Sequence, residues 1–436
     1  KLSTSLICMR AKGSKKDKKR KQKILFLINT MGRAGAERCL INLLNSLDYD
    51  KCQVSFYAVI GMGELFGEVP AQVRILNEEP DPSSVFGRQG RRKLRKLMIK
   101  RLCSRHNWFR YGKGIVKALV FQLKAGRVDG KKLLWKFLAD TAAAQEETYD
   151  LAIAYIQGAA TWYLAERVRA SKKAAFVHND LTASGYDMEE EAVAYRKMDQ
   201  IFCVSETVQR SLLEAIPDLK NRTEVFHNIL DEEGIRQRSE ERQGLSLRWK
   251  SGAEGIRLLT TGRLCRVKGY DLAIRAMALL CDRMENVRWY VLGEGEERGR
   301  LEKLIRSFGL EEKFILLGAV ENPYPYFAEC DLYVHTSRWE GYCTAISEAI
   351  LLGKPVVATD CAANREQLRR NQWGLLAKMT PESIAERITV ALEDADKAED
   401  LAWKMRQGAE RRAREKEKNL EKLYALAEEG WKREAE

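Results

Sequence analysis

Two carboxylates, Glu340 and Glu348, stand eight residues apart around a predicted helix start. Gly341 follows the first of them and lets the chain turn tightly into a helix that begins near Cys343. Backbone N–H groups at a helix start favour an anion, and the two carboxylates can accept hydrogen bonds from sugar hydroxyls on either side of it. Residues 337–348 are therefore a candidate site for a ligand that carries both an anionic group and sugar hydroxyls.

Two cations, Arg263 and Lys268, lie in the segment 262–269, between a predicted strand and the predicted helix 270–280. Ligands of open α/β sheets bind outside the carboxyl ends of the strands, so these side chains can face a diphosphate. The alternative is a surface Arg and Lys that flank a helix start without a ligand. His178 also has two interpretations, because a histidine at a strand end either contacts a ligand or is packed and hydrogen-bonded.

The elements that must position these residues are predicted to form two successive α/β domains. Residues 23–29 are a short apolar run suited to a strand buried on both faces, and Gly32 and Gly35 separate it from a helical pattern. Strand, glycine turn and helix in this order open a doubly wound domain. Further strands are predicted at 54–59, 151–156, 174–178 and 201–205. The first domain therefore covers residues 23–230 and follows a basic tail at 1–22.

A polar stretch with little strand pattern, residues 231–254, predicts a linker between the domains. Strand-sized apolar runs then follow at 257–262, 289–293, 314–318, 332–335 and 355–359. Most of them are separated by helix-length segments, which predicts a second parallel sheet within residues 255–382. Residues 383–436 form a charged helical region. The expected fold class is α/β, with two Rossmann-like domains facing across a cleft and a helical C-terminal region.

The net charge of +13 is concentrated in two segments. Residues 1–23 contain ten Lys or Arg and one acid, and residues 88–127 contain fourteen Lys or Arg and no acid. A basic excess this localised favours contact with phosphates, either of anionic lipid or of nucleic acid.

The basic insertion at 88–127 also has apolar residues at helical spacing, followed by two aromatic residues. A basic helix with an apolar stripe and aromatic anchors suits a membrane interface. The residues predicted to face an anionic membrane are Arg91, Arg92, Lys93, Arg95, Lys96, Trp108 and Phe109. Two alternatives stay open: a solvated helix that uses its stripe for the core, and an RNA-binding surface. No recognised nucleic-acid module accompanies the helix, which disfavours RNA.

The ten cysteines include no Cys-x-x-Cys pair and no nearby histidine that would complete a metal set. The four histidines also lie far apart in the sequence. We therefore expect reduced, mostly buried thiols in a cytoplasm, and no metal. No apolar run approaches the roughly 18 to 20 residues of a membrane-spanning helix, and the short apolar start precedes its charges, the reverse of a secretory signal.

The chain resembles the retaining glycosyltransferases of family 4, which have the two-domain GT-B fold. The resemblance covers nearly everything from about Lys23 onward and is most specific between Gly262 and Leu376. In that family, the first Glu of a Glu-x7-Glu pair contacts the transferred sugar and the second holds the nucleotide ribose. The resemblance therefore implies a catalytic role for Glu340 and a donor-binding role for Glu348.

The same resemblance implies that Arg263 and Lys268 bind the donor diphosphate and that His178 lies near the acceptor. It also implies that glycines of the first loop approach phosphate. The further donor-binding residues implied in this way are Gly341, Tyr342, Cys343, Thr344, Gly32 and Gly35. The chain departs from the family pattern at Cys343, where a glycine is common, and at residues 361–366, where a glycine pair often precedes the final Glu.

The resemblance implies a retaining, metal-independent enzyme that moves a hexosyl or N-acetylhexosaminyl group from a nucleotide sugar, with UDP expected as the nucleotide. The expected acceptor is a saccharide or a lipid-linked saccharide in cell-surface glycan synthesis, and the nucleotide sugar is a co-substrate, so no cofactor is expected. The basic insertion places the protein, as an expectation, at the cytoplasmic face of a membrane. The alternative is a nucleotide-binding adaptor at a membrane or RNA surface that has kept the fold and lost turnover.

Overall fold

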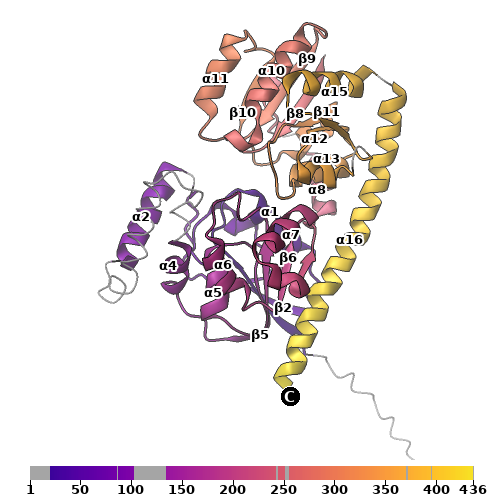
Figure 1. Ribbon diagram of the computed structural model, residues 1–436. Helices are drawn as coiled ribbons and strands as arrows, with labels where there is room; N and C mark the ends of the chain where they lie inside the picture. Colours follow the sequence, from indigo (N-terminus) through magenta and orange to yellow (C-terminus); the bar gives the residue numbers. More distant parts are fainter. Residues whose placement is uncertain are drawn as a thin grey trace, which may run out of the picture.

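The computed structural model describes residues 20–85, 87–102, 134–241, 244–250, 255–369, 372–393 and 395–435. They form two α/β domains and a long C-terminal helix that runs along both (Figure 1). Most of the basic tail at 1–22 and the predicted anchors Trp108 and Phe109 lie outside the described residues. The prediction of two Rossmann-like domains with a helical C-terminal region is confirmed.

The first domain contains a parallel sheet in the strand order β3-β2-β1-β4-β5-β6-β7. Its strands are β1 (Gln22–Ile28), β2 (Cys52–Ala58), β3 (Arg74–Ile75), β4 (Thr148–Ala154), β5 (Arg169–Val177), β6 (Gln200–Cys203) and β7 (Thr223–Val225). Residues 24–28 are fully buried, as expected of a parallel strand covered on both faces. The strand order reverses between the neighbours β1 and β4, where a doubly wound sheet has its ligand crevice.

Helices cover both faces of this sheet. They are α1 (Gly35–Asn45), α2 (Arg88–Leu102), α4 (Trp135–Asp140), α5 (Ala159–Arg167), α6 (Met188–Tyr195) and α7 (Glu206–Ala215), with 3-10 turns at Glu64–Glu68 and Pro217–Arg222. The N-terminus of α7 is capped by Ser205, whose Oγ accepts a hydrogen bond from the backbone N–H of Val208. This cap fixes the start of α7 directly after β6, at the edge of the sheet that faces the second domain.

The second domain has a parallel sheet in the order β10-β9-β8-β11-β12-β13, again with a reversal at its centre, between β8 and β11. Its strands are β8 (Ile256–Thr261), β9 (Val287–Leu292), β10 (Phe314–Gly318), β11 (Leu332–His335), β12 (Val356–Thr359) and β13 (Leu375–Ala377). Its helices are α10 (Tyr270–Cys281), α11 (Arg298–Ser307), α12 (Tyr324–Glu329), α13 (Thr344–Leu351), α14 (Ala362–Gln367) and α15 (Pro381–Glu393).

The segment expected to be a linker, 231–254, differs from that expectation. It contains α8 (Glu232–Ser239) and α9 (Leu247–Lys250), and its apolar side chains Ile235 and Trp249 are fully buried in the core of the second domain. The indole N–H of Trp249 donates to Glu329 over 2.8 Å. Each of these short helices has one buried apolar residue among many charged residues. The sequence therefore shows little helical periodicity, and the segment looks like a linker.

The helix α16 (Ala395–Ala435) starts beside the second domain and ends on the first (Figure 1). Its residues Leu423 and Ala427 are buried in the core of the first domain. Gly430 is needed there, because a Cβ atom at this position would lie 2.0 Å from the carbonyl oxygen of Asp150. The last helix therefore ties the two domains together.

The helix α2, at the edge of the first domain beside α4 in Figure 1, carries the predicted basic surface. Its apolar residues Leu94, Leu97 and Met98 pack against the core of the first domain. This is the arrangement of the alternative reading, in which the stripe serves the core. Lys93 is paired with Asp81 over 2.8 Å. The other basic residues of the predicted surface, Arg91, Arg92, Arg95 and Lys96, are exposed or partly exposed.

Across the described part of the chain, no helix combines the length and the apolar character needed to cross a membrane. The cysteines among these residues form no disulfide, and all but Cys281 are buried.

Candidate active site

The candidate residues of the second domain meet at the carboxyl ends of β8 and β11. The loop after β8 and the loop after β11 are fastened to each other by backbone contacts. Gly269, at a left-handed φ of 66°, lies so close to Thr336 that a Cβ atom would be 2.1 Å from the Thr336 carbonyl oxygen. The backbone N–H of Arg338 donates to Val267 over 2.7 Å. These contacts place Lys268, at the end of the first loop, beside the second loop.

Lys268 and Glu340, 72 positions apart, form a short ion pair with a distance of 2.6 Å between Nζ and Oε1. Nε2 of His335, the last residue of β11, lies 3.0 Å from the same oxygen. Burial alone would raise the pKa of Glu340, but Lys268 and His335 hold it well below its ordinary value. Burial disfavours the charge on Lys268, yet Glu340 and Cys343 raise its pKa. The carboxylate and the ammonium group are therefore both charged at neutral pH.

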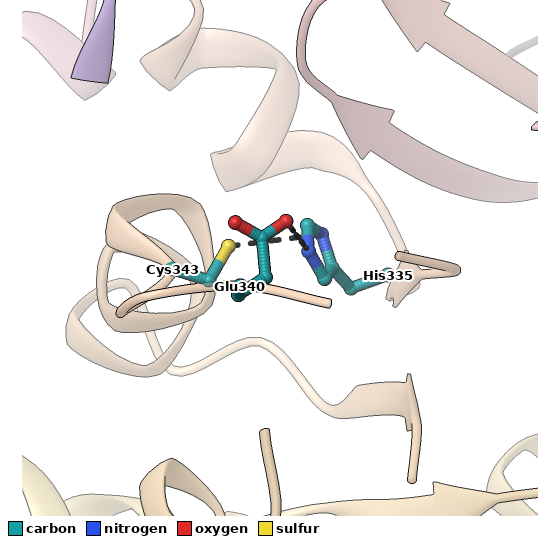
Figure 2. A group of neighbouring side chains, drawn as sticks. All are labelled: His335, Glu340 and Cys343. Carbon is teal, nitrogen blue, oxygen red and sulfur yellow. Dashed lines mark hydrogen bonds and ion pairs between the residues drawn. The ribbon is translucent and has the colours of Figure 1, made fainter. Parts of the chain in front are cut away.

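Figure 2 shows His335, Glu340 and Cys343 as one group. Nδ1 of His335 lies 3.7 Å from Sγ of Cys343 and 3.3 Å from the hydroxyl of Tyr333. Burial would lower the pKa of His335, but Cys343 and Glu340 raise it to about 9. No histidine stands next to these cysteines in the sequence, but the turn between β11 and α13 brings His335 and Cys343 together in the fold. The eight-residue spacing of His335 and Cys343 was the available signal.

Glu348, predicted to hold the ribose, lies inside α13 and is 7% exposed. The hydroxyl of Tyr324 donates to its Oε1 over 3.2 Å. Burial raises the pKa of Glu348 above its ordinary value, although Tyr324, Arg38 and Arg238 act in the opposite direction. Arg238 lies over the ring of Tyr324, 4.7 Å from its centroid. The two glutamates therefore differ in environment: Glu340 is paired with cations, and Glu348 is hydrogen-bonded to a phenol.

The turn that follows Glu340 contacts the first domain. A Cβ atom at Gly341 would lie 1.9 Å from the carbonyl oxygen of His178, so only glycine fits there. Oγ of Ser205 donates to the Gly341 carbonyl over 2.8 Å. Thr344, at the start of α13, lies 3.3 Å from the thiol of Cys39 on α1. The structure thus places Gly341 against His178 and Thr344 against Cys39, both of the first domain.

His178 follows β5 and is 7% exposed. Its backbone N–H donates to the side chain of Gln157 over 3.2 Å. Burial lowers the pKa of the imidazole to about 4, although a hydrogen bond with the backbone of Tyr155 opposes this. The ring is therefore neutral at physiological pH. Within the described residues Nε2 is buried and has no hydrogen-bond partner.

The remaining predicted residues are Arg263, Gly32, Gly35 and Tyr342. Arg263 is exposed directly after β8, while Gly32 follows β1 and is buried. Gly35 begins α1, and a Cβ atom there would have open space. Tyr342 packs its ring on His227, with centroids 5.0 Å apart. The donor-binding roles of these residues stay predictions.

Two residues that the sequence reasoning did not assign, Glu366 and Gln367, support the site from α14. Glu366 accepts hydrogen bonds from the backbone N–H groups of Glu206 and Thr207, over 2.7 and 3.0 Å, and so covers the start of α7 in the other domain. Gln367 bonds both the N–H and the carbonyl of Cys343. The signal for Glu366 was the motif at 361–366, which we noted only for its missing glycines, and Gln367 directly follows it.

Comparison with known proteins gives a family match within the second half of the chain. Residues 246–410 match the family described as Glycosyl transferases group 1. A Campylobacter jejuni protein named N-acetylgalactosamine-N,N'-diacetylbacillosaminyl-diphospho-undecaprenol 4-alpha-N-acetylgalactosaminyltransferase is 31% identical over 205 residues, 47% of this chain and 53% of that one. The Saccharomyces cerevisiae phosphatidylinositol N-acetylglucosaminyltransferase GPI3 subunit is 28% identical over 188 residues, 42% of this chain and 40% of its own. The chain thus spans about half the length, or less, of these relatives.

Solved structures match the whole fold. Anabaena HepE in complex with UDP and glucose has a TM-score of 0.64 at 22% identity, covering 93% of this chain and all of that one. OtsA has a TM-score of 0.63 at 10% identity, covering 93% of this chain and 99% of its own. The chain therefore has the GT-B fold of two facing Rossmann-like domains, and its second domain carries a group 1 glycosyl transferase region.

Proposed function

We propose that this protein is a retaining glycosyltransferase that moves a hexosyl or N-acetylhexosaminyl group from a UDP-sugar to an acceptor held by the first domain. The observation that carries the proposal is the Lys268–Glu340 ion pair at the strand reversal of the second sheet, beside the backbone of His178 in the other domain. A cation next to a helix start suits a diphosphate, and a fixed carboxylate suits a sugar hydroxyl. The HepE structures with UDP and with UDP-glucose support a UDP-sugar donor.

In this mechanism Lys268 and Arg263 stabilise the negative charge that grows on the diphosphate as the bond to the sugar breaks. Glu340 uses one oxygen for Lys268 and His335, which leaves the second oxygen for the transferred sugar. The acceptor hydroxyl attacks from the face that the diphosphate leaves, and the departing phosphate takes its proton. This reaction needs no carboxylate nucleophile and no metal ion, because charge stabilisation and positioning lower the barrier.

The proposed acceptor is a sugar on a lipid carrier, used in cell-surface glycan synthesis at the cytoplasmic side of a membrane. The names of two relatives contain a lipid-linked acceptor, diphospho-undecaprenol in one and phosphatidylinositol in the other. The exposed side of α2 adds a basic surface to the same domain that would hold the acceptor. Each basic residue near an anionic leaflet contributes about 1 kcal/mol, so a few of them can hold the domain on a bilayer.

The test of the transfer reaction is a panel of nucleotide sugars with detergent-dispersed polyprenyl-diphosphate saccharides, followed by mass analysis of the product and of its anomeric configuration. Transfer with retained configuration in the presence of EDTA is the expected result. Donor binding without hydrolysis or transfer from any donor would favour the alternative, a nucleotide-binding adaptor that has lost turnover.

The test of the membrane role is sedimentation with vesicles that contain or lack anionic lipid, at low and high salt. The wild type should sediment with anionic vesicles at low salt only. A variant with Arg91, Arg92, Arg95 and Lys96 changed to Gln should stay in solution. Equal sedimentation of this variant would return α2 to the role of a solvated surface and favour a soluble acceptor.

A further inference from the structure

Three side chains that suit a metal ion converge beside the proposed donor site. One ring nitrogen of His335, a carboxylate oxygen of Glu340 and Sγ of Cys343 all lie within 4.8 Å of one another (Figure 2). His335 ends β11, Glu340 lies in the following turn and Cys343 is the residue before α13. The turn that shapes the donor site therefore also assembles an N, O, S set, and it is the one such group found among the residues that the structure describes.

The three donor atoms can close on one ion through small side-chain movements. Bonds of about 2.0 to 2.3 Å at tetrahedral angles put neighbouring ligand atoms roughly 3.3 to 3.7 Å apart. Nε2 of His335 lies 3.0 Å from the Glu340 carboxylate, whereas it is Nδ1 that lies 3.7 Å from Sγ of Cys343. One ring nitrogen binds the ion, and the set of one nitrogen, one oxygen and one sulfur lies within 4.8 Å. A nitrogen, an oxygen and a thiolate together favour a borderline-soft cation such as Zn²⁺ over Mg²⁺ or Ca²⁺, which take oxygen ligands.

The set is more deeply buried on one side than on the other. His335 is 1% exposed and Cys343 is 4% exposed, so both are shielded from solvent. The side chains of Glu340 and Lys268 are 13% and 21% exposed, so the carboxylate side is the more accessible one.

We propose that His335, Glu340 and Cys343 bind one thiophilic divalent cation, with Zn²⁺ the best fit, and that this cation inhibits by taking Glu340 from Lys268 and from the donor sugar. Binding releases the thiol proton of Cys343 and the imidazolium proton of His335 to water, and it changes no other covalent bond. The binding is independent of the function proposed above, whereas the inhibition rests on it.

Lys268 provides a specific test of this site. Its ammonium group lies 2.6 Å from Glu340 and repels any second cation at the same carboxylate. Removal of Lys268 should therefore strengthen metal binding by about tenfold or more, because both the competition and the repulsion disappear. A cation bound elsewhere on the surface would not respond to this change.

The first experiment is a titration with Co²⁺, read by the thiolate-to-cobalt absorption in the near ultraviolet. The wild type should bind one cobalt through sulfur, and Lys268→Ala should bind it more tightly. Cys343→Ser and, as a second variant, His335→Asn should lose the band, with folding checked by circular dichroism. Cys361→Ser, a buried cysteine on a neighbouring loop, and Cys281→Ser, which is partly exposed, should keep it. A band that persists in Cys343→Ser, or no band in the wild type, overturns the site.

The second experiment is inhibition by Zn²⁺ of transfer or hydrolysis, at several concentrations of UDP-sugar, with reversal by EDTA. Zn²⁺ should compete with the donor in the wild type and in Cys361→Ser. Absence of turnover on every donor would contradict the proposed function, while the cobalt titration would still decide the metal site. If cobalt binds at Cys343 but Zn²⁺ does not change turnover, the inhibitory role is wrong.

Discussion

The two sheets share the same order in their first six strands, and the first sheet adds β7, yet the two domains carry different chemistry at the edges that face each other. At the reversal of the second sheet, charged groups are packed together, with Lys268, His335 and Glu340 in direct contact. At the matching edge of the first sheet, the predicted residues are the neutral His178 and two glycines. One parallel sheet supplies a charged site, and the other supplies a close-fitting, nearly neutral surface.

The two domains therefore serve different purposes although they share one architecture. Charge stabilisation needs groups that are fixed in place before the reaction, and the fastened loops after β8 and β11 provide this. The contact between the domains depends on shape instead, because Gly341 has no room for a side chain against the His178 carbonyl. Changes in the second domain should therefore affect turnover most, and changes in the first should affect acceptor use and fit.

The largest effect is expected for Lys268→Ala. Loss of the ammonium group should lower kcat by roughly 10²-fold or more, the scale of losing one donor that acts on the transition state. Arg263→Ala should lower kcat in the same way. The measurement is steady-state kinetics on the preferred donor, with the exposed Lys303→Ala on α11 as a matched control. Near-normal turnover in folded Lys268→Ala would remove the charge role from this loop.

Substitutions of Glu340 and Glu348 should change different kinetic parameters. Glu340→Gln should slow the chemical step by roughly 10²-fold, while Glu348→Gln should mainly raise the donor KM, by roughly tenfold, because a ribose contact acts equally in ground state and transition state. Separate determination of kcat and donor KM for both variants checks this. Identical kinetic changes would contradict the division of roles between them.

Gly341→Ala tests the contact between the domains. The added methyl group cannot fit against the His178 carbonyl, so the domains must separate, and transfer should fall roughly tenfold with a lower Tm. Gly299→Ala on α11, where a Cβ atom has open space, is the matched control and should leave both quantities unchanged. If Gly341→Ala behaves like its control, the closed contact does not matter for turnover.

His178→Gln should have a smaller effect, a several-fold loss of transfer through the acceptor KM, on the scale of one neutral hydrogen bond. Hydrolysis of the donor without acceptor should not change. Because the pKa of His178 is about 4, its ring stays neutral above about pH 5, so the variant should not alter the pH profile near neutrality. A pH-dependent limb that disappears in this variant would contradict a neutral role.

The smallest effect concerns pH and the domain junction. His227 lies between Glu366 and Glu415, at 3.6 and 3.3 Å. Burial opposes its charge, but Tyr342 and these two carboxylates raise the pKa to about 10. The stability it contributes is present below the ordinary pKa of 6.5 and is lost as the pH rises through 10. The Tm of the wild type should therefore fall more between pH 7 and 10 than that of His227→Gln, and equal falls would exclude His227 as the cause.

Much of the fold could be predicted because its signals are local. Apolar runs such as 24–28, bounded by glycine, predict buried parallel strands, and their alternation with helical segments predicts two doubly wound sheets. The strands β3, β7 and β13 have only two or three residues and leave no pattern. The helices within 231–254 were missed for a related reason, since Ile235 and Trp249 are isolated anchors among charges.

The residue types of the candidate site were also determined by the sequence, through the spacing of Glu340, Gly341 and Glu348 after an apolar strand. Their partners were decided by the tertiary structure. Lys268 meets Glu340 across 72 positions, and His178 meets Gly341 across the two domains. Local spacing fixes which groups can share a helix or a turn, whereas contacts between distant segments depend on how sheets and domains pack. The pairing of Glu340 with Lys268 and His335 therefore exists only in the folded chain.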